Sequence, residues 1–325
     1  MRIVFMGSPV FSVPALRSLV REGYDVVAVY TQPDRPSGRG RTLTPPAVKL
    51  AAQELGIEVR QPEKLREPAA LDALAALRPD VIVVCAYGQI LSQAVLDVPP
   101  KQCINVHFSL LPRHRGATPA AAAILAGDAF TGVSIQLVRV KLDTGPLLAS
   151  AAIPVMETDT TISLMQKLSI VGADLLIEAL NGWLHGERVP LPQDDSRSTY
   201  IRRIDKETGL IDWELPAETI SRQVRAYYPW PGSYSTWKGK KLKIVQAEVL
   251  PGPKGMPGIV VAWNGSNAID VQTGDGLLRI TRMQLEGKRA MSAAEFMRGQ
   301  PELIGDTLGR HHNYVKSSGE DDRQA

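Results

Sequence analysis

Short apolar runs alternate with segments of helical periodicity along the first part of the chain. The runs at residues 3–6, 26–30 and 81–84 have the length and composition of buried strands. Between them, apolar residues recur at helical spacing over residues 10–22, 46–55 and 68–77. Because strands that alternate with helices favour parallel pairing, this pattern predicts an α/β domain with a doubly wound, mainly parallel sheet.

The same domain continues through a predicted strand at residues 103–108 and two further strands at residues 131–140 and 147–154. A long amphipathic helix at residues 160–184 is expected to close it. The turn after the first strand, Gly7-Ser8-Pro9, lacks the G-x-G-x-x-G spacing of dinucleotide-binding folds. A nicotinamide-binding Rossmann domain is therefore disfavoured.

The pattern changes after a polar segment with two prolines at residues 186–198, which indicates a linker. One helix is predicted beyond it, at residues 217–227. Five short strands separated by glycine-rich turns follow, at residues 233–237, 242–250, 258–263, 268–272 and 277–284. Five short strands favour a small β-barrel, and the oligonucleotide-binding (OB) fold is the usual five-stranded form.

The length of 325 residues also favours two domains. We expect a catalytic domain at residues 1–188, a linker at residues 189–204, an OB-like domain at residues 205–316 and a disordered polar tail at residues 317–325.

Composition narrows the expected environment. No apolar run is long enough to cross a membrane, and the start of the chain lacks the layout of a signal peptide. Cys85 and Cys103 end apolar runs, so buried free thiols are expected rather than a disulfide. The two cysteines and five histidines lack the tight spacing of metal ligands, and no metal site is expected. A reducing cytoplasm is the expected location, while a net charge of +3 does not by itself identify a nucleic-acid binder.

Candidate chemistry centres on Asn105 and His107. Alternate residues of a strand point to the same face, so the two side chains should lie side by side at a strand end. Asp143 could orient the imidazole, and no serine or cysteine nucleophile is evident between them. The group suits direct acyl-type transfer, in which a developing oxyanion must be stabilised. A structural histidine and a turn-capping asparagine are the alternatives, and spacing alone leaves both open.

Asn105-x-His107-x-Ser109-Leu110-Leu111-Pro112, followed by Leu142-Asp143-Thr144-Gly145, resembles the signature of the folate-dependent formyltransferases. Residues 31–41 and Pro229-Trp230-Pro231 extend the resemblance along nearly the whole chain, from Arg2 to about Tyr314. The resemblance implies a Rossmann-like formyltransferase domain, an OB-like second domain, and transfer of a formyl group from 10-formyltetrahydrofolate to an amine without a metal.

The resemblance also assigns residues. It implies catalytic roles for Asn105, His107 and Asp143. It places folate contacts at Ser109, Leu110, Leu111 and Pro112, and at Gln89, Ile90 and Leu91. For Ile90 and Leu91 a plain helix core is an equal alternative.

Two basic segments bear on the amine acceptor: Arg35, Arg39 and Arg41 in one loop, and Lys240 and Lys241 among aromatic residues in another. Charged loops are solvated by default, but the resemblance implies that the arginine loop contacts a tRNA acceptor stem. It also implies that the acceptor is the methionine of initiator methionyl-tRNA and that the protein is a monomer. Most of the neighbouring aromatic residues are expected in the core, with Trp230, between two prolines, as a packing anchor between the domains.

Two other functions remain open at this stage. One is formylation of a smaller amine, such as a nucleotide sugar or an aminoribosyl phosphate, which would need neither basic segment. The other is a non-catalytic module that binds folate or RNA, which would not need the three residues Asn105, His107 and Asp143 together.

Overall fold

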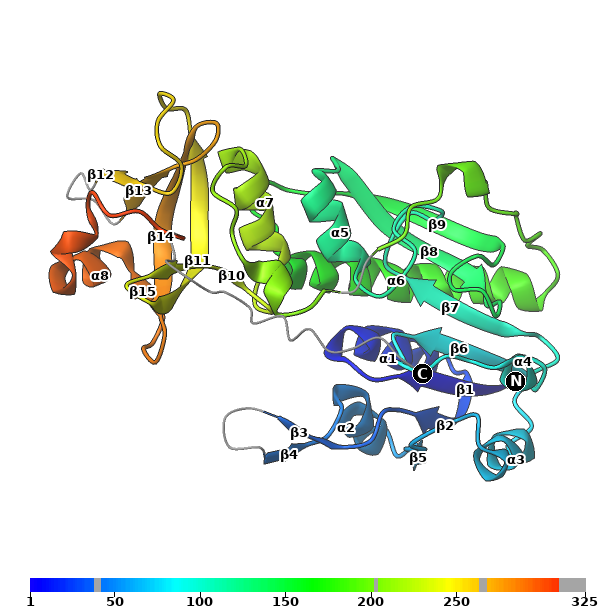
Figure 1. Ribbon diagram of the computed structural model, residues 1–325. Helices are drawn as coiled ribbons and strands as arrows, with labels where there is room; N and C mark the ends of the chain where they lie inside the picture. Colours follow the sequence, from blue (N-terminus) through cyan, green and yellow to red (C-terminus); the bar gives the residue numbers. More distant parts are fainter. Residues whose placement is uncertain (38–41, 202–203, 263–267, 310–325) are drawn as a thin grey trace, which may run out of the picture. The chain divides into compact units, whose positions relative to one another are not determined.

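The computed structural model describes residues 1–37, 42–201, 204–262 and 268–309 (Figure 1). The chain forms two compact units that divide between residues 203 and 204. No helix among these residues combines the length and apolar character needed to cross a membrane.

A seven-stranded sheet with the order β5-β2-β1-β6-β7-β8-β9 forms the centre of the first unit. The strands are β1 (Arg2–Gly7), β2 (Asp25–Tyr30), β5 (Val59–Arg60), β6 (Val81–Cys85), β7 (Cys103–His107), β8 (Phe130–Leu137) and β9 (Leu147–Pro154). Pairing is parallel from β5 to β7 and antiparallel from β7 to β9. Residues 3–6 of β1 are fully buried, as expected for a strand covered on both faces. The predicted α/β fold is confirmed.

Helices cover this sheet, and the longest, α6, fixes the orientation of β7. The helical elements of this unit are η1 (Val10–Ser12), α1 (Val13–Arg21), α2 (Ala47–Glu54), α3 (Pro68–Ala76), α4 (Gln93–Leu96), α5 (Pro119–Ala126), α6 (Thr161–Leu184) and η2 (Asp195–Arg197). Gly172 lets α6 approach the sheet closely, because a Cβ there would lie 3.1 Å from Val106 Cγ1 and 3.3 Å from Val133 Cγ1. Since Val106 points toward α6, its neighbours Asn105 and His107 point to the opposite face.

Three parts of the first unit differ from the local prediction. An exposed hairpin of β3 (Arg35–Ser37) and β4 (Thr42–Thr44) occupies the arginine loop, and its tip, with Arg39 and Arg41, lies outside the described residues. Strand β8 ends at Leu137 rather than at residue 140. The predicted linker contacts the first unit: Leu191 pairs with Leu147 through two 2.8 Å backbone hydrogen bonds. The polar tail, residues 317–325, also lies outside the described residues.

The second unit is a curled antiparallel sheet of order β10-β11-β14-β13-β12, with β15 added beside β14. Its elements are η3 (Glu207–Gly209), α7 (Ala217–Ala226), β10 (Ser233–Trp237), β11 (Lys240–Leu250), β12 (Val260–Ala262), β13 (Ile269–Gln272), β14 (Leu277–Leu285), β15 (Met291–Ser292), α8 (Ala293–Gly299) and η4 (Pro301–Leu303). Residues 305–309 lie between the two edge strands, because Val260 N–H donates to Asp306 O at 2.9 Å and Gly309 N–H donates to Thr236 O at 3.0 Å. The OB-like prediction is therefore confirmed as a curled sheet whose gap is bridged by a non-strand segment.

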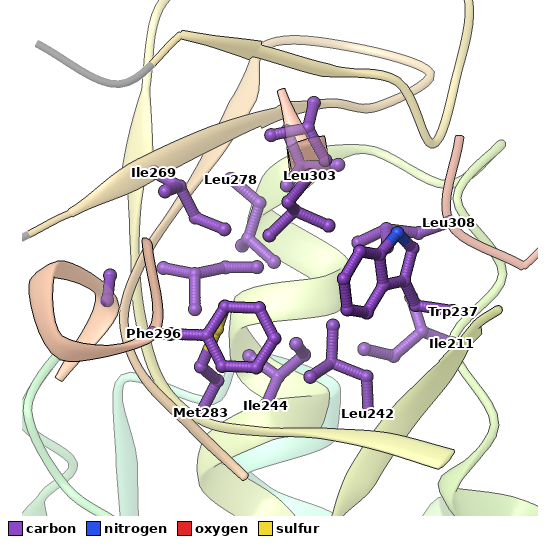
Figure 2. Packing of buried hydrophobic residues seen from close by; sticks show 14 of the residues in the cluster. Ile211, Trp237, Leu242, Ile244, Ile269, Leu278, Met283, Phe296, Leu303 and Leu308 are labelled. Atoms are coloured by element: carbon purple, nitrogen blue, oxygen red, sulfur yellow. The ribbon is translucent and has the colours of Figure 1, made fainter. Parts of the chain in front are cut away.

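The core of the second unit contains some of the aromatic residues but not Trp230. Trp237 packs edge-on against Phe296, with ring centroids 5.7 Å apart, inside the apolar cluster of Figure 2. Trp230, by contrast, is 56% exposed. Its side chain is therefore not part of this core, and a packing role for Trp230 between the domains stays a prediction.

Candidate active site

Asn105 and His107 lie at the carboxyl end of β7, where the sheet changes from parallel to antiparallel pairing. In this class of fold, ligands bind beyond the carboxyl ends of strands. Asn105 pairs directly with Gln136 of β8, so both side chains share one face. Among the described residues, the Asn105 side-chain amide has no protein hydrogen-bond partner, which leaves it available for a ligand.

A cavity of about 520 Å³ opens on this face, within the usual range for a small-molecule site. Asn105, His107 and Asp143 all line it, so the structure brings the three predicted catalytic residues together. Its other walls are mostly apolar. The exposed side chains of Ile90 and Leu142 contribute, with 86% and 59% of their surface accessible. Exposed apolar groups beside a polar cluster suit a flat ring system with one reactive end.

The predicted folate residues divide into two groups. Gln89, Ile90 and Leu91 line the cavity, although the Gln89 side-chain amide is already engaged with Leu65 N–H and Pro62 O. The helix-core alternative fails for Ile90, which is among the most exposed apolar residues of the described chain.

Ser109, Leu110, Leu111 and Pro112 do not border this cavity. They form a turn behind it, in which Ser109 Oγ donates to Arg113 O at 2.7 Å and Leu111 N–H donates to Ser134 Oγ at 3.0 Å. Folate contacts by these four residues stay a prediction.

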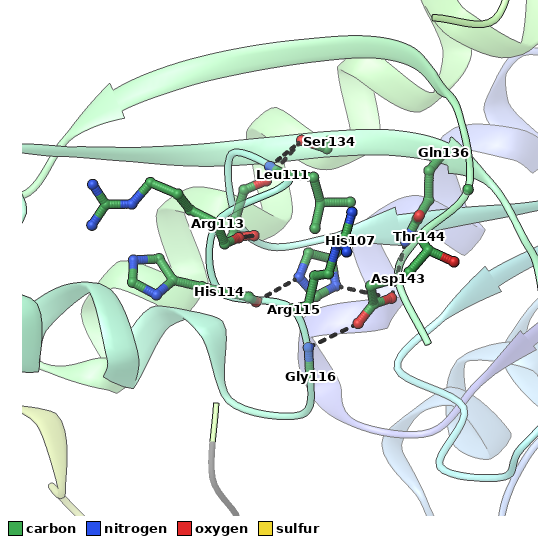
Figure 3. A network of polar contacts seen from close by, with 12 residues as sticks. His107, Leu111, Arg113, His114, Arg115, Gly116, Ser134, Gln136, Asp143 and Thr144 are labelled. Carbon is green, nitrogen blue, oxygen red and sulfur yellow. Dashed lines mark hydrogen bonds and ion pairs between the residues drawn. The ribbon is translucent and has the colours of Figure 1, made fainter. Parts of the chain in front are cut away.

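His107 is buried between a carbonyl and a carboxylate (Figure 3). Its Nε2 lies 3.0 Å from His114 O, and because a carbonyl can only accept, Nε2 carries a hydrogen. Nδ1 therefore holds the lone pair of the neutral ring and lies 3.6 Å from Asp143 Oδ1. Burial lowers the pKa of His107, and the Asp143 carboxylate opposes that shift.

Asp143 is held in place at two points. Gly116 N–H donates to Oδ2 and Gln136 Nε2 donates to Oδ1, each at 2.9 Å. Its backbone is left-handed, with φ of 52°. Gly145 completes the turn, because a Cβ there would lie 1.6 Å from Leu137 O, closer than any side chain allows. The Leu-Asp-Thr-Gly motif is thus one tight turn that aims a carboxylate at His107.

Two glutamines of this site, Gln136 and Gln193, were not predicted from the sequence. Gln136 is 2% exposed, and the available signal was that it is the single amide side chain on strand β8. Gln193 Nε2 donates to Asp143 O at 3.0 Å and to Gly145 O at 2.7 Å. Nothing about the position of Gln193 in the predicted linker indicated this role.

Of the predicted tRNA-binding residues, Arg39 and Arg41 lie outside the described residues, and Arg35 does not line the cavity. Arg35 is exposed on β3 and lies 3.8 Å from Glu63. Lys240 is exposed at the start of β11, and the Lys241 ammonium sits 3.4 Å from the centroid of the Tyr234 ring. A cation held on a half-buried aromatic ring suits a nucleic-acid backbone but is also common on ordinary surfaces.

Comparison with known proteins places this geometry in a family. Residues 1–180 match the family described as Formyl transferase, and residues 203–301 match Formyl transferase, C-terminal domain. The chain is 48% identical over 315 residues to the methionyl-tRNA formyltransferase of Dehalococcoides mccartyi strain 195, covering 95% of this chain and 99% of that protein. It is 47% identical over 300 residues to the methionyl-tRNA formyltransferase of Chloroflexus aurantiacus strain J-10-fl, covering 92% and 97%.

Solved structures agree on the fold. WlaRD, a sugar 3N-formyl transferase, superposes with a TM-score of 0.66 at 17% identity over 89% of this chain and 99% of that chain. HypX from Aquifex aeolicus, in complex with tetrahydrofolic acid, superposes with a TM-score of 0.59 at 22% identity over 93% and 47%. Since both parts of the chain match the same family and the relatives align over nearly their full length, the resemblance seen in the sequence is confirmed, and the chain belongs to the formyl transferase family.

Proposed function

We propose that this chain is a methionyl-tRNA formyltransferase that transfers the formyl group of 10-formyltetrahydrofolate to the α-amino group of methionine on initiator tRNA. The proposal rests on the convergence of Asn105, His107 and Asp143 on one cavity, in a chain that aligns over 95% of its length with a methionyl-tRNA formyltransferase. The reaction would proceed in the cytoplasm, on a monomer, and requires no metal.

The chemistry is a direct transfer. The amine nitrogen attacks the formyl carbon, a C–N bond forms, and the carbonyl oxygen becomes anionic. Collapse of this tetrahedral intermediate breaks the bond between the formyl carbon and N10 of the folate, while one proton leaves the amine and one is delivered to N10. Asn105 is assigned to donate its side-chain amide to the oxyanion, a contribution typically worth ~3–4 kcal/mol.

His107 and Asp143 act on charge and protons at the same centre. The neutral imidazole can accept a proton only at Nδ1, because Nε2 already donates to His114 O. Protonation there creates a positive charge 3.6 Å from the Asp143 carboxylate and beside the cavity. That arrangement favours an imidazolium during the reaction although burial disfavours it at rest.

The two substrates occupy different surfaces. The apolar cavity wall, with Ile90, Val140 and Leu142, is assigned to the folate ring system. Arg35, Arg39 and Arg41 and the second unit's Lys240 and Lys241 are assigned to phosphates of the tRNA. A small amine acceptor would need none of these cations.

Steady-state formyl transfer tests the proposal. The purified chain is supplied with 10-formyltetrahydrofolate and either methionyl initiator tRNA or a free amino-sugar nucleotide, and turnover is expected only with the tRNA. Asn105→Ala should lower kcat by at least ~10², the size of one oxyanion donor. Asn181→Ala, which alters an asparagine on α6, is the matched control. Preferential turnover of the sugar nucleotide would assign the chain to another acceptor, and a fully active Asn105→Ala would remove Asn105 from the mechanism.

A further inference from the structure

A polar network behind the cavity holds the turn that carries Asp143. Gln193 Nε2 bridges the backbone carbonyls of Asp143 and Gly145, at 3.0 and 2.7 Å, and lies 3.4 Å from Gln136 Oε1. Neither Gln193 nor its neighbour Arg115 lines the cavity. Their contacts are therefore with the groups that shape the site, and not with the substrate space.

The orientation of the Gln193 amide is set by Arg115. Arg115 Nε and Nη2 donate to Gln193 Oε1 at 3.2 and 2.7 Å, and a guanidinium can only donate. A flipped amide would place its NH2 group against Arg115 and its oxygen against two carbonyl oxygens. The guanidinium is fully buried and is itself fixed by Asp195 at 2.6 Å and by the Tyr200 hydroxyl at 3.0 Å.

The hydrogen bonds all run in one direction toward Asp143. Arg115 donates to Gln193, and Gln193 donates to the backbone of Asp143 and toward Gln136. Gln136 then donates to Asp143 Oδ1, while Gly116, the residue after Arg115, donates to Oδ2. Figure 3 shows Arg115, Gly116 and Gln136 arranged around Asp143. Each of the two glutamine amides therefore has one orientation that matches its donors and acceptors.

We propose that Gln193, oriented by buried Arg115, is a positioning residue that fixes the left-handed turn of Asp143 and so aims its carboxylate at His107. The inference rests on the proposed function, in which Asp143 takes part in formyl transfer. It assigns a role in the reaction to a segment outside the recognised sequence motif.

Two substitutions at Gln193 and two at a control site test the role. Gln193→Ala removes both hydrogen bonds to the turn, and Gln193→Glu keeps an acceptor for Arg115 but has no hydrogen to donate. Gln272 is the matched control, because its buried Nε2 also donates to backbone carbonyls, Pro253 O at 2.9 Å and Thr273 O at 3.2 Å, within the second unit.

Both Gln193 variants are expected to lower kcat by ~10- to 100-fold, the scale of a misplaced reacting group, with KM for each substrate within about threefold of wild type. Gln272→Ala and Gln272→Glu should keep wild-type kcat. An unchanged kcat in folded Gln193→Ala, or a loss confined to KM, would overturn the proposal. If Gln193→Ala does not fold, kcat of Gln193→Glu is compared with that of Gln272→Glu instead, because a glutamate at position 193 still accepts from Arg115.

A second measurement needs no turnover. Burial and the nearby His114 ring lower the pKa of His107, whereas the Asp143 carboxylate and the hydrogen bond to the His114 carbonyl raise it. Release of Asp143 in Gln193→Ala should therefore lower the pKa of His107, measured by NMR titration of the imidazole, and Gln272→Ala should not. If wild-type protein failed to formylate methionyl-tRNA while Gln193→Ala still shifted this titration, the proposed function would fall and the positioning role would stand. An unshifted His107 titration would overturn the role.

Discussion

Asp143→Asn tests the site most sharply, because the change preserves shape and alters hydrogen bonding. The carboxylate accepts from two donors, Gly116 N–H and Gln136 Nε2, each at 2.9 Å. In the variant one acceptor oxygen becomes an NH2 group, which must face one of these two donors. Rotation of the Gln136 amide does not resolve the conflict, since its Oε1 already faces Gln193 Nε2 at 3.4 Å.

The expected cost follows from burial. The side chain of Asp143 is 7% exposed and Gln136 is 2% exposed, so both groups are largely shielded from bulk water. One buried donor left without a partner costs about 1–3 kcal/mol of the free energy of unfolding. The loss of the carboxylate also removes the charge that raises the pKa of His107, and kcat should fall by ~10² or more, the scale of an acid–base group. Folate affinity should change less.

A compensating double variant separates the two effects. In Asp143→Asn with Gln136→Glu, the new carboxylate at position 136 can accept from Asn Nδ2 and from Gln193 Nε2, so every donor regains a partner. Urea unfolding should show most of the stability restored, whereas kcat should stay low because the negative charge has moved away from position 143. An Asp143→Asn single variant as stable and active as wild type, or a double variant with full kcat, would refute this reasoning.

Three further predictions follow from burial and charge. Burial lowers the pKa of His107, so the unfolded chain takes up a proton on this residue at a higher pH than the folded chain does. The free energy of unfolding should therefore fall as the pH drops below about 6.5, and urea unfolding of His107→Gln should show a weaker dependence on pH. Burial raises the pKa of Cys85 and Cys103 to about 12, so a thiol reagent at neutral pH should modify both only after denaturation, and rapid modification of the folded protein would contradict this. Arg39→Ala should raise KM for methionyl-tRNA but not for the folate. The slope of log tRNA affinity against log salt concentration should become shallower by up to ~1. If tRNA kinetics were unchanged across a salt series, the loop would be a solvated turn.

The positions of the strands, and which side chains of a strand share a face, could be predicted from the sequence because both depend on local periodicity. The run at β1 is apolar at every position and proved buried on both faces. Asn105 and His107 share a face because any strand alternates, and no tertiary information was needed to place them together. The predicted bounds of β9, residues 147–154, match the structure for the same reason.

The Leu-Asp-Thr-Gly motif indicated that Asp143 belongs to the site, but it did not indicate how Asp143 reaches His107. Asp143 lies far from His107 in sequence, and its 3.6 Å approach depends on the β7–β8 register, on a left-handed backbone and on the space left free at Gly145. Each of these is a property of neighbouring chain segments. Likewise, only the structure shows that the turn from Ser109 to Pro112 is held by the buried Ser134 hydroxyl, which accepts from Leu111 N–H, and that its residues do not line the cavity.

Only the tertiary structure could assign the polar residues that hold the site. Gln193 stands in a polar, proline-bounded segment whose composition is that of a linker, yet its amide bridges the Asp143 turn. Arg115 is an arginine in a loop with no distinguishing pattern, yet its side chain is fully buried. Hydrophobic periodicity is written into each segment separately, so it can be read along the chain. A buried hydrogen bond is a property of two distant segments at once, and its partner exists only after the fold has brought them together.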